Sequence, residues 1–245
     1  MALTQDEAIA LRRLDYSETS QVLVFLTREH GKVRAIAKGV KRGTRSRFAV
    51  GIDLLELGHV VVSARPGGRA ELATVTEWKQ TRSMTGLRQR LARLHAAEYA
   101  AEVTAALTED WDPHPRVFAA LVGLLDGLCQ ANQAFDRLVD FQRELLDEIG
   151  SLPDFAACLA CGRVPDPDEP VHFSSFEGGL LCRDCEPAHV EKRELLLGCL
   201  SVLRGQAGEP ASQAAAFDIL NYHIAHLIGR NPTTAPILQA TAPHP

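Results

Sequence analysis

The sequence predicts an α+β fold, in which a small N-terminal β-barrel precedes an α-helical domain that carries a cysteine-bearing insertion. Three observations predict it. Residues that favour strands recur in short runs over about the first 80 positions. After Trp78 the apolar residues change to a helical spacing. Two C-x-x-C pairs then interrupt the helical part.

The N-terminal region shows five short runs with strand character. We expect these strands over residues 8–14, 22–26, 33–37, 52–63 and 71–77. Gly31 lies between the second and third runs and can supply the positive φ of a hairpin turn. No helix here is long enough for a crossover between parallel strands, so we predict an antiparallel five-stranded barrel of the OB type over residues 1–80.

The remainder of the chain has the pattern of a helical bundle. Helices are expected near residues 87–107, 117–128, 135–149, 187–203 and 211–229. We therefore assign an α-helical domain to residues 81–153 and 187–230, and a small inserted finger to residues 154–186. The tail 231–245 contains four prolines and no periodicity, which indicates an extended or flexible segment.

Charge is distributed unevenly along the chain. The net charge is −5, but residues 1–93 hold 17 Lys and Arg against 9 Asp and Glu. A basic N-terminal part within an acidic chain favours a nucleic-acid partner, although a chance excess of solvated arginines explains the same count. No apolar run reaches the roughly 18 residues of a membrane span, and charged residues occupy the first twenty positions. We therefore expect a cytoplasmic protein.

The inserted segment carries the most specific motif. Cys158 and Cys161 form one C-x-x-C pair, and Cys182 and Cys185 form a second after 20 intervening residues. Each tight turn aims two thiolates at one metal, and two such turns complete a tetrahedron, so the spacing predicts one structural zinc ion per chain. A redox dithiol, a rubredoxin-like iron site and a pair of disulfides are the alternatives.

Other residues near this motif have simpler interpretations. A shell of four cysteines is complete without His172 and His189, which we interpret as solvated side chains. Cys129 and Cys199 lie among leucines and are expected to be thiols in the core. Three cations close to the finger are weaker candidates for DNA contacts: Arg183, Lys192 and Arg193.

A basic loop is expected between the third and fourth strands. Ten residues there contain two glycines, two hydroxyl side chains and five cations, namely Lys38, Lys41, Arg42, Arg45 and Arg47. Such a loop can follow a phosphate backbone. Phe48 ends the loop and could either stack on a base or anchor the loop in the core. Flanking candidates for DNA contacts are Arg12, Arg13, Arg34, Arg65, Arg69, Lys79 and Arg82.

Sequence motifs of common enzyme classes are missing. The chain has no P-loop, no G-x-S-x-G, no H-E-x-x-H and no G-x-G-x-x-G. We therefore expect no catalytic site and no small-molecule substrate. Two other functions remain open at this point: a zinc-containing protein-interaction adaptor whose basic loop does not bind DNA, and a zinc-dependent nuclease, which a complete cysteine shell disfavours.

Several segments together resemble the bacterial DNA repair protein RecO family. They are residues 15–20, the hairpin of residues 27–33, the basic stretch 37–42, and the two cysteine pairs with the Gly178 and Gly179 that precede the second. The resemblance covers most of residues 1–190. Gly43 departs from it, because the family often has a further polar or basic residue there.

The resemblance implies an N-terminal OB-fold, a helical domain and an embedded zinc finger. It implies binding to single- and double-stranded DNA, annealing of complementary strands and partnership with RecR. Together with RecR, such proteins help to load the RecA recombinase onto strands covered by single-stranded-DNA-binding protein. A nucleoid-associated protein without a membrane partner is the corresponding expectation.

Overall fold

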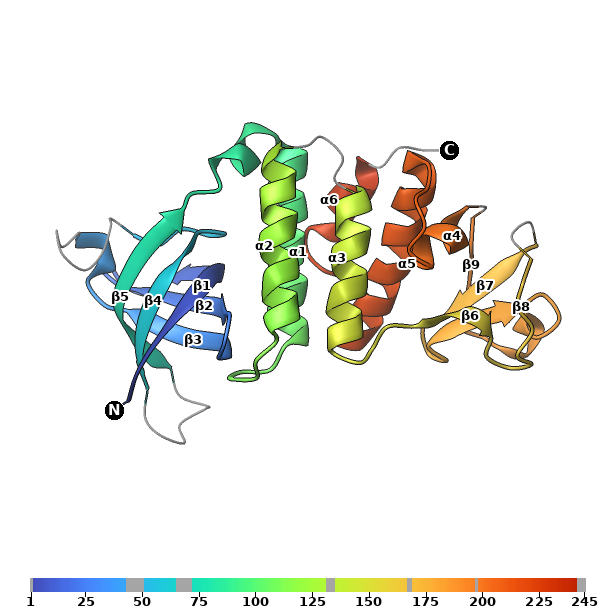
Figure 1. Ribbon diagram of the computed structural model, residues 1–245, viewed down its shortest axis with the longest axis horizontal. Helices are drawn as coiled ribbons and strands as arrows, with labels where there is room; N and C mark the ends of the chain where they lie inside the picture. Colours follow the sequence, from blue (N-terminus) through green and yellow to red (C-terminus); the bar gives the residue numbers. More distant parts are fainter. Residues whose placement is uncertain are drawn as a thin grey trace. The chain divides into compact units, whose positions relative to one another are not determined.

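The computed structural model describes residues 2–42, 51–64, 72–130, 135–166, 169–196 and 198–241. The chain forms two compact units, residues 1–130 and 131–245 (Figure 1). The first unit contains a five-stranded barrel and two helices, and the second contains further helices and a small sheet, so the predicted α+β class is confirmed. Within the described segments, no helix is both long and apolar enough to span a membrane.

The first unit is built on a closed barrel with the strand order β1-β2-β3-β5-β4. Its strands are β1 (Ala2–Asp15), β2 (Gln21–Thr27), β3 (Gly31–Ala37), β4 (Leu57–Ala64) and β5 (Ala73–Arg82). All neighbours are antiparallel except β3 and β5, which pair in parallel through a short contact. Five strands occur near the predicted positions.

The prediction for the fourth strand was wrong at its beginning. That strand was expected from residue 52, but β4 begins at Leu57. The intervening residues form a turn in which Leu55 has a φ of 65°. The carboxylate of Glu56 accepts a hydrogen bond from the backbone N–H of Asp53 at 3.1 Å. An apolar sequence run does not reveal this turn, because Ile52 and Leu55 are buried without belonging to a strand.

Small side chains fill much of the barrel interior. Alternate residues of each strand point inward, and the core includes alanines on β1 and β3 together with valines on β3, β4 and β5. Phe25 and Trp78 provide the bulk, with ring centroids 5.4 Å apart. A five-stranded barrel is narrow, so it tolerates only a few large side chains among small ones.

Two helices belong to the same unit as the barrel: α1 (Leu91–Leu107) and α2 (Pro115–Gln130), preceded by the short η2 (Thr85–Gln89). Lys32 on β3 links the barrel to the end of α1, because its ammonium donates to the carbonyls of Ala105 and Thr108. The same ammonium lies 3.5 Å from the Asp110 carboxylate. The predicted α-helical domain, residues 81–153 and 187–230, grouped these two helices with the later ones.

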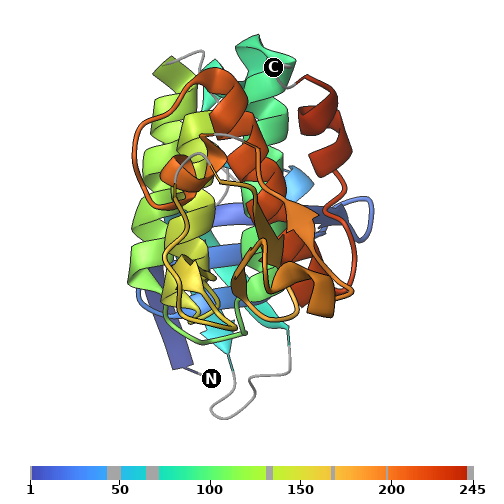
Figure 2. The ribbon, with the colours of Figure 1, turned by 90° about the vertical axis from the view of Figure 1, so that its right-hand side faces the viewer.

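The second unit combines α3 (Phe135–Glu148), α4 (Cys199–Leu203), α5 (Pro210–Ile228) and α6 (Ala235–Ala240) with a four-stranded sheet. The sheet has the order β6-β8-β7-β9 and consists of β6 (Asp154–Cys158), β7 (Val171–Ser174), β8 (Gly179–Cys182) and β9 (Arg193–Glu194). Figure 2 shows this sheet in front of the helices of its unit.

Two expectations in this unit were wrong. The helix expected over residues 187–203 is confined to α4, because β9 pairs with β7 and Gly198 adopts a φ of 78° before α4 begins. The tail 231–245 was expected to be extended or flexible, but it contains α6, in which Ala235 and Leu238 are buried. A proline in the first turn is compatible with a helix start, so the prolines of this tail did not exclude α6.

Gly31 provides a test of how the barrel is joined to the segment after α1. Its φ is 72°, and a Cβ atom built there would lie 1.9 Å from the carbonyl oxygen of Asp112. We expect Gly31→Ala to destabilise the protein in urea denaturation. Gly39→Ala is the matched control, because Gly39 has a φ of 71° but nothing within 4 Å of such a Cβ.

Both glycines have a positive φ, so alanine strains the backbone at either position. Only at Gly31 does the new Cβ also meet the backbone of Asp112. Gly31→Ala should lower the free energy of unfolding by at least about 2 kcal/mol more than Gly39→Ala, because backbone atoms block the new methyl group. Equal losses in the two variants would show that Asp112 moves away at no cost.

Candidate metal centre and nucleic-acid interface

The four cysteines of the two C-x-x-C pairs lie together in the second unit. Strands β6 and β8 run in parallel and end at Cys158 and Cys182, so both strands deliver a cysteine to the same edge of the sheet. All four sulfurs lie within 4.8 Å of one another, and those of Cys161 and Cys182 are 3.8 Å apart. A tetrahedron with metal–sulfur bonds of about 2.3 Å requires sulfurs about 3.8 Å apart, so the set could hold one metal ion.

The backbone of each cysteine pair supports this arrangement. The N–H of Gly162 donates to the carbonyl of Cys158 at 2.8 Å, with Gly162 at a φ of 76°. In the second pair, the N–H of Cys185 donates to the carbonyl of Cys182 at 3.0 Å. All four thiols are free, so the disulfide alternative is wrong for this structure.

The thiols of this cluster have opposed acidities. Burial disfavours ionisation of Cys158, but backbone N–H groups that include that of Cys182 lower its pKa to about 6. Hydrogen bonds with the sulfurs of Cys182 and Cys161 raise the pKa of Cys185 to about 12. A thiol must lose its proton to become a metal ligand, and a divalent cation among the four sulfurs would favour that loss.

A polar cluster around Glu191 fastens the small sheet to α5. The Glu191 carboxylate accepts from the hydroxyl of Ser174 at 2.7 Å, from the backbone N–H of Phe176 at 2.9 Å and from the hydroxyl of Tyr222. Burial opposes ionisation of Glu191, but these donors outweigh it and hold its pKa below the ordinary value. The guanidinium of Arg193 lies 3.8 Å from the centre of the Tyr222 ring.

His223 makes the second connection between α5 and the sheet. Its Nδ1 lies 2.8 Å from the hydroxyl of Ser175 and its Nε2 lies 3.0 Å from the carbonyl of Ser151. The side chain is buried, and this burial lowers the pKa of His223 below 6.5 despite the favourable carbonyl. Protonation of this imidazole is therefore less favourable in the folded unit than in the unfolded chain.

The stability of the second unit should decrease as the pH falls through the range in which His223 titrates in the unfolded chain. A lowered folded pKa means that the unfolded state binds more protons below about pH 6.5, so protonation favours unfolding. We expect the urea midpoint to fall between about pH 7.5 and pH 5.5. His223→Gln should reduce that decrease, whereas an unchanged pH dependence in this variant would contradict the assignment.

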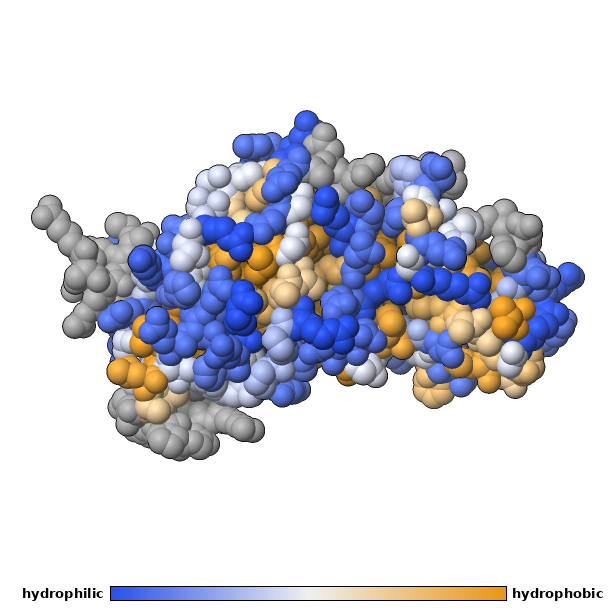
Figure 3. All heavy atoms as spheres, viewed as in Figure 1, coloured by the Kyte–Doolittle hydropathy of each residue, from blue (hydrophilic) through white to orange (hydrophobic). Residues whose placement is uncertain are grey.

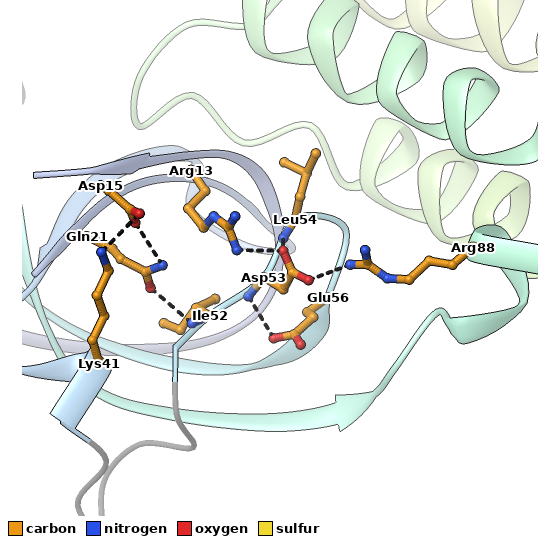
Figure 4. Close-up of polar contacts among 9 residues, drawn as sticks. All are labelled: Arg13, Asp15, Gln21, Lys41, Ile52, Asp53, Leu54, Glu56 and Arg88. Carbon is orange, nitrogen blue, oxygen red and sulfur yellow. Dashed lines mark hydrogen bonds and ion pairs between the residues drawn. The ribbon is translucent and has the colours of Figure 1, made fainter. Parts of the chain in front are cut away.

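The predicted DNA-contact residues of the first unit gather partly at one end of the barrel (Figure 4). Lys41 follows β3 and extends its ammonium to Asp15 at the end of β1, at 2.9 Å. This hydrogen bond is the main cause that lowers the pKa of Asp15. Gln21 at the start of β2 donates to Asp15 and accepts from the N–H of Ile52 at 3.0 Å. The residues on both sides of the undescribed segment 43–50 are thus attached to the β1–β2 end of the barrel.

Asp53 forms a second cluster at this end of the barrel. It accepts from the guanidinium of Arg13 at 2.7 Å and also pairs with Arg88 from η2 (Figure 4). The side chains of Arg13 and Arg88 remain 42% and 55% exposed. Glu56 lies beside this group and accepts from the Asp53 N–H, so two positive and two negative charges meet beside the strand ends.

The other predicted contact residues divide into three groups. Arg34 pairs with Asp110, and Arg82 pairs with Asp126, both at 2.6 Å. Three more are exposed and have no recorded ion pair with a described residue: Arg12, Lys38 and Lys79. Those outside the described residues are Arg45, Arg47, Arg65 and Arg69, together with Phe48 and the side chain of Arg42.

Sequence reasoning did not find the acidic partners of these cations. Asp53, Asp110 and Asp126 each neutralise a predicted DNA-contact residue that lies far away in the chain. Arg88 on η2 lies in the same cluster as Arg13. Only the closure of the barrel and the placement of α1 and α2 bring these groups together, so no local pattern could indicate them.

Comparison with known proteins identifies the family of this chain. Residues 1–84 match the model of the N-terminal part of recombination protein O, and residues 88–235 match that of its C-terminal part. The chain belongs to the RecO family. The resemblance found in the sequence is thereby confirmed.

Several DNA repair proteins named RecO are similar along most of their length. That of Anaeromyxobacter sp. (strain K) is 33% identical, with 91% of this chain and 90% of that protein covered. That of Rubrobacter xylanophilus is 36% identical, with 88% and 85% covered. That of Rhodopirellula baltica is 32% identical, with 86% and 77% covered. The similarity therefore extends across both compact units.

Proposed function

We propose that this RecO-family chain is a recombination mediator without catalytic activity of its own. In this proposal it binds single- and double-stranded DNA, anneals complementary strands and, with RecR, helps to load RecA onto strands covered by single-stranded-DNA-binding protein. The family assignment supports this role. Since its substrate would be chromosomal DNA, we expect it at the nucleoid in the cytoplasm.

The proposal depends most on the exposed cations of the barrel. Lys38 and Lys41 lie at the end of β3, and Arg12 and Arg13 lie on the neighbouring β1. Where these cations have acidic partners, the pairs are open to water. Exposed ion pairs are weak, so DNA phosphates can compete with Asp15 and Asp53 for the same cations.

We infer that the barrel is of the OB type. Its strand order, in which β1 pairs with β4 and β3 pairs with β5, closes five strands into one barrel. Small barrels of this type bind nucleic acids through strand faces and the loops beside them. The predicted DNA-contact residues that the structure describes lie on β1, β3 and β5 and after β3, which agrees with such a use.

Annealing on this surface requires no covalent chemistry. A basic surface screens the repulsion between two phosphate backbones and raises the local concentration of both strands. Base pairing then supplies the specificity. Lys38, Lys41, Arg12 and Arg13 would hold phosphates without reading sequence.

An adaptor function without DNA binding is the alternative, and one observation favours a docking role for the second unit. Apolar and hydrophilic side chains are interspersed over its small sheet (Figure 3). Large apolar residues exposed in and near this sheet are Leu159, Val164, Phe176, Val190 and Leu196. Salt dependence separates the two functions, because binding through several cations weakens steeply with salt and apolar docking does not.

DNA binding should be lost in part when two described cations at the end of the barrel are removed. Lys38→Ala with Lys41→Ala should weaken binding of a single-stranded oligonucleotide and lower the slope of log affinity against log salt by about 1.4. Fluorescence anisotropy at several salt concentrations measures both quantities.

Arg137→Ala with Arg230→Ala is the charge-matched control, because both arginines are exposed and lie in the second unit. This control should bind DNA as the wild type does. If both double variants bind equally well, the DNA interface is not at this end of the barrel. If the wild type itself shows no salt-sensitive binding, the adaptor function replaces the mediator function.

We also propose that the metal of the cysteine cluster is a single structural zinc ion. Four soft thiolate ligands in a tetrahedral arrangement suit zinc and leave no position for a catalytic water. The finger residues would gain folding free energy from the metal, since the sheet is small. Cys158 and Cys182 are buried, so their sulfurs would shield the metal from one side.

Metal analysis tests this proposal directly. The purified protein should contain one zinc per chain, and Cys158→Ser or Cys182→Ser should lower that content and destabilise the second unit. Cys129→Ser is the control, because Cys129 lies on α2 in the first unit and should leave the zinc content unchanged. Iron in place of zinc would identify the rubredoxin-like alternative, and a fully loaded Cys158→Ser protein would contradict the ligand assignment.

A further inference from the structure

The outer face of β1, β2 and β3 carries an apolar row that faces solvent. Leu14 pairs with Val22, and Val22 pairs with Ile36, so the three side chains lie side by side on neighbouring strands. Their chain neighbours Leu23 and Ala35 are in the barrel core, so this row points outward. Leu14 is 59% exposed. Single exposed apolar side chains are common on protein surfaces, so this row points to a ligand only through the groups that flank it.

Cations flank this row on both sides. Two residues away along the strands lies the row of Arg12, Val24 and Arg34, of which Arg34 pairs with Asp110. In the opposite direction Tyr16 follows β1 directly and Lys38 follows β3 directly, and both side chains are exposed. An apolar strip between cations complements a chain whose flat apolar parts alternate with negative charges, as in single-stranded DNA.

Tyr16 is held in place although its side chain is 68% exposed. The backbone N–H of Tyr16 donates to the carbonyl of Ser20 at 3.1 Å. The hydroxyl of Ser17 accepts from the N–H of Ser20 at 3.1 Å, and Lys41 holds Asp15 on the other side. A fixed backbone reduces the conformational entropy that the ring loses when it stacks on a ligand.

We propose that Leu14 and Tyr16 bind unpaired nucleobases, and that this β1–β3 outer face therefore distinguishes single-stranded from double-stranded DNA. This inference rests on the proposed function, and it adds that the outer face of β1, β2 and β3 selects single-stranded DNA. Bases in a duplex are stacked on each other and cannot offer their faces to a tyrosine ring. Phosphates would lie against Arg12 and Lys38.

The charges of the β1–β2 turn agree with a base rather than a phosphate at Tyr16. Glu18 is exposed in that turn and would repel a phosphate there. A partner protein on the same apolar row is the competing occupant, and the experiment below separates it from DNA.

The test compares Tyr16→Ala, Leu14→Ala and Tyr16→Phe in the full chain. The probes are a thymidine oligonucleotide, an abasic oligonucleotide of equal length and a blunt duplex. Tyr16→Ala should bind the thymidine strand at least about fivefold more weakly, the lower limit for the loss of one stacked base. Leu14→Ala should weaken it in the same direction, and Tyr16→Phe should bind like the wild type. Binding of the abasic strand and of the duplex should stay within about twofold.

Leu3→Ala is the matched control, because Leu3 is 70% exposed on the distant end of β1. Equal losses on all three probes would overturn the inference, because Tyr16 would then act on the fold or the charges. Unchanged thymidine binding in Tyr16→Ala would also overturn it and leave the row to a protein partner. The proposed function fails separately, if the wild type binds none of the three probes in a salt-sensitive way.

Discussion

β1 pairs with β2 along one edge and with β4 along the other, and this double pairing closes the barrel of the first unit. Closure requires a narrow interior, which explains the alanines of β1 and β3 in the core. It also brings the end of β1 beside the turn before β4, where Arg13 meets Asp53. The outer row of Leu14, Val22 and Ile36 depends on the same registers, so both proposed DNA contacts follow from how the strands are aligned.

Carboxylates position the cations of this surface without burying them. Asp53 holds Arg13 and Arg88 together, and Asp15 holds Lys41, yet all five side chains keep part of their surface in water. Exposed pairs contribute little to stability, and their chief effect is to restrict the side chains. A DNA phosphate that replaced Asp15 or Asp53 would therefore meet cations that are already in position. The free-energy cost of removing water from these cations would be small.

Local sequence patterns predicted the parts of this structure that local chemistry determines. The strand runs, the turn at Gly31 and the cysteine spacing correspond to β2, β3 and the sulfur cluster. The segment around β9 was predicted to be helical, and this prediction was wrong. A strand of two residues forms because it pairs with β7, and its own residues do not indicate it. The ion pairs and the exposed row of Leu14 were equally invisible, since barrel closure and strand register determine them.

The charge of the first unit shows why local arrangement matters more than net charge. Residues 1–93 carry a net charge of +8, but residues 1–130 carry only +3, because α1, α2 and the segment between them are acidic. Asp110 and Asp126 from this part neutralise Arg34 and Arg82, whereas Arg12 and Lys38 have no recorded ion pair with a described residue. The acidic part therefore lowers the positive potential near Arg34 and Arg82. The positive potential near Arg12 and Lys38 remains. In the proposed function, this potential would direct DNA to the end of the barrel that also carries Tyr16, where a strand held by its phosphates would stack a base.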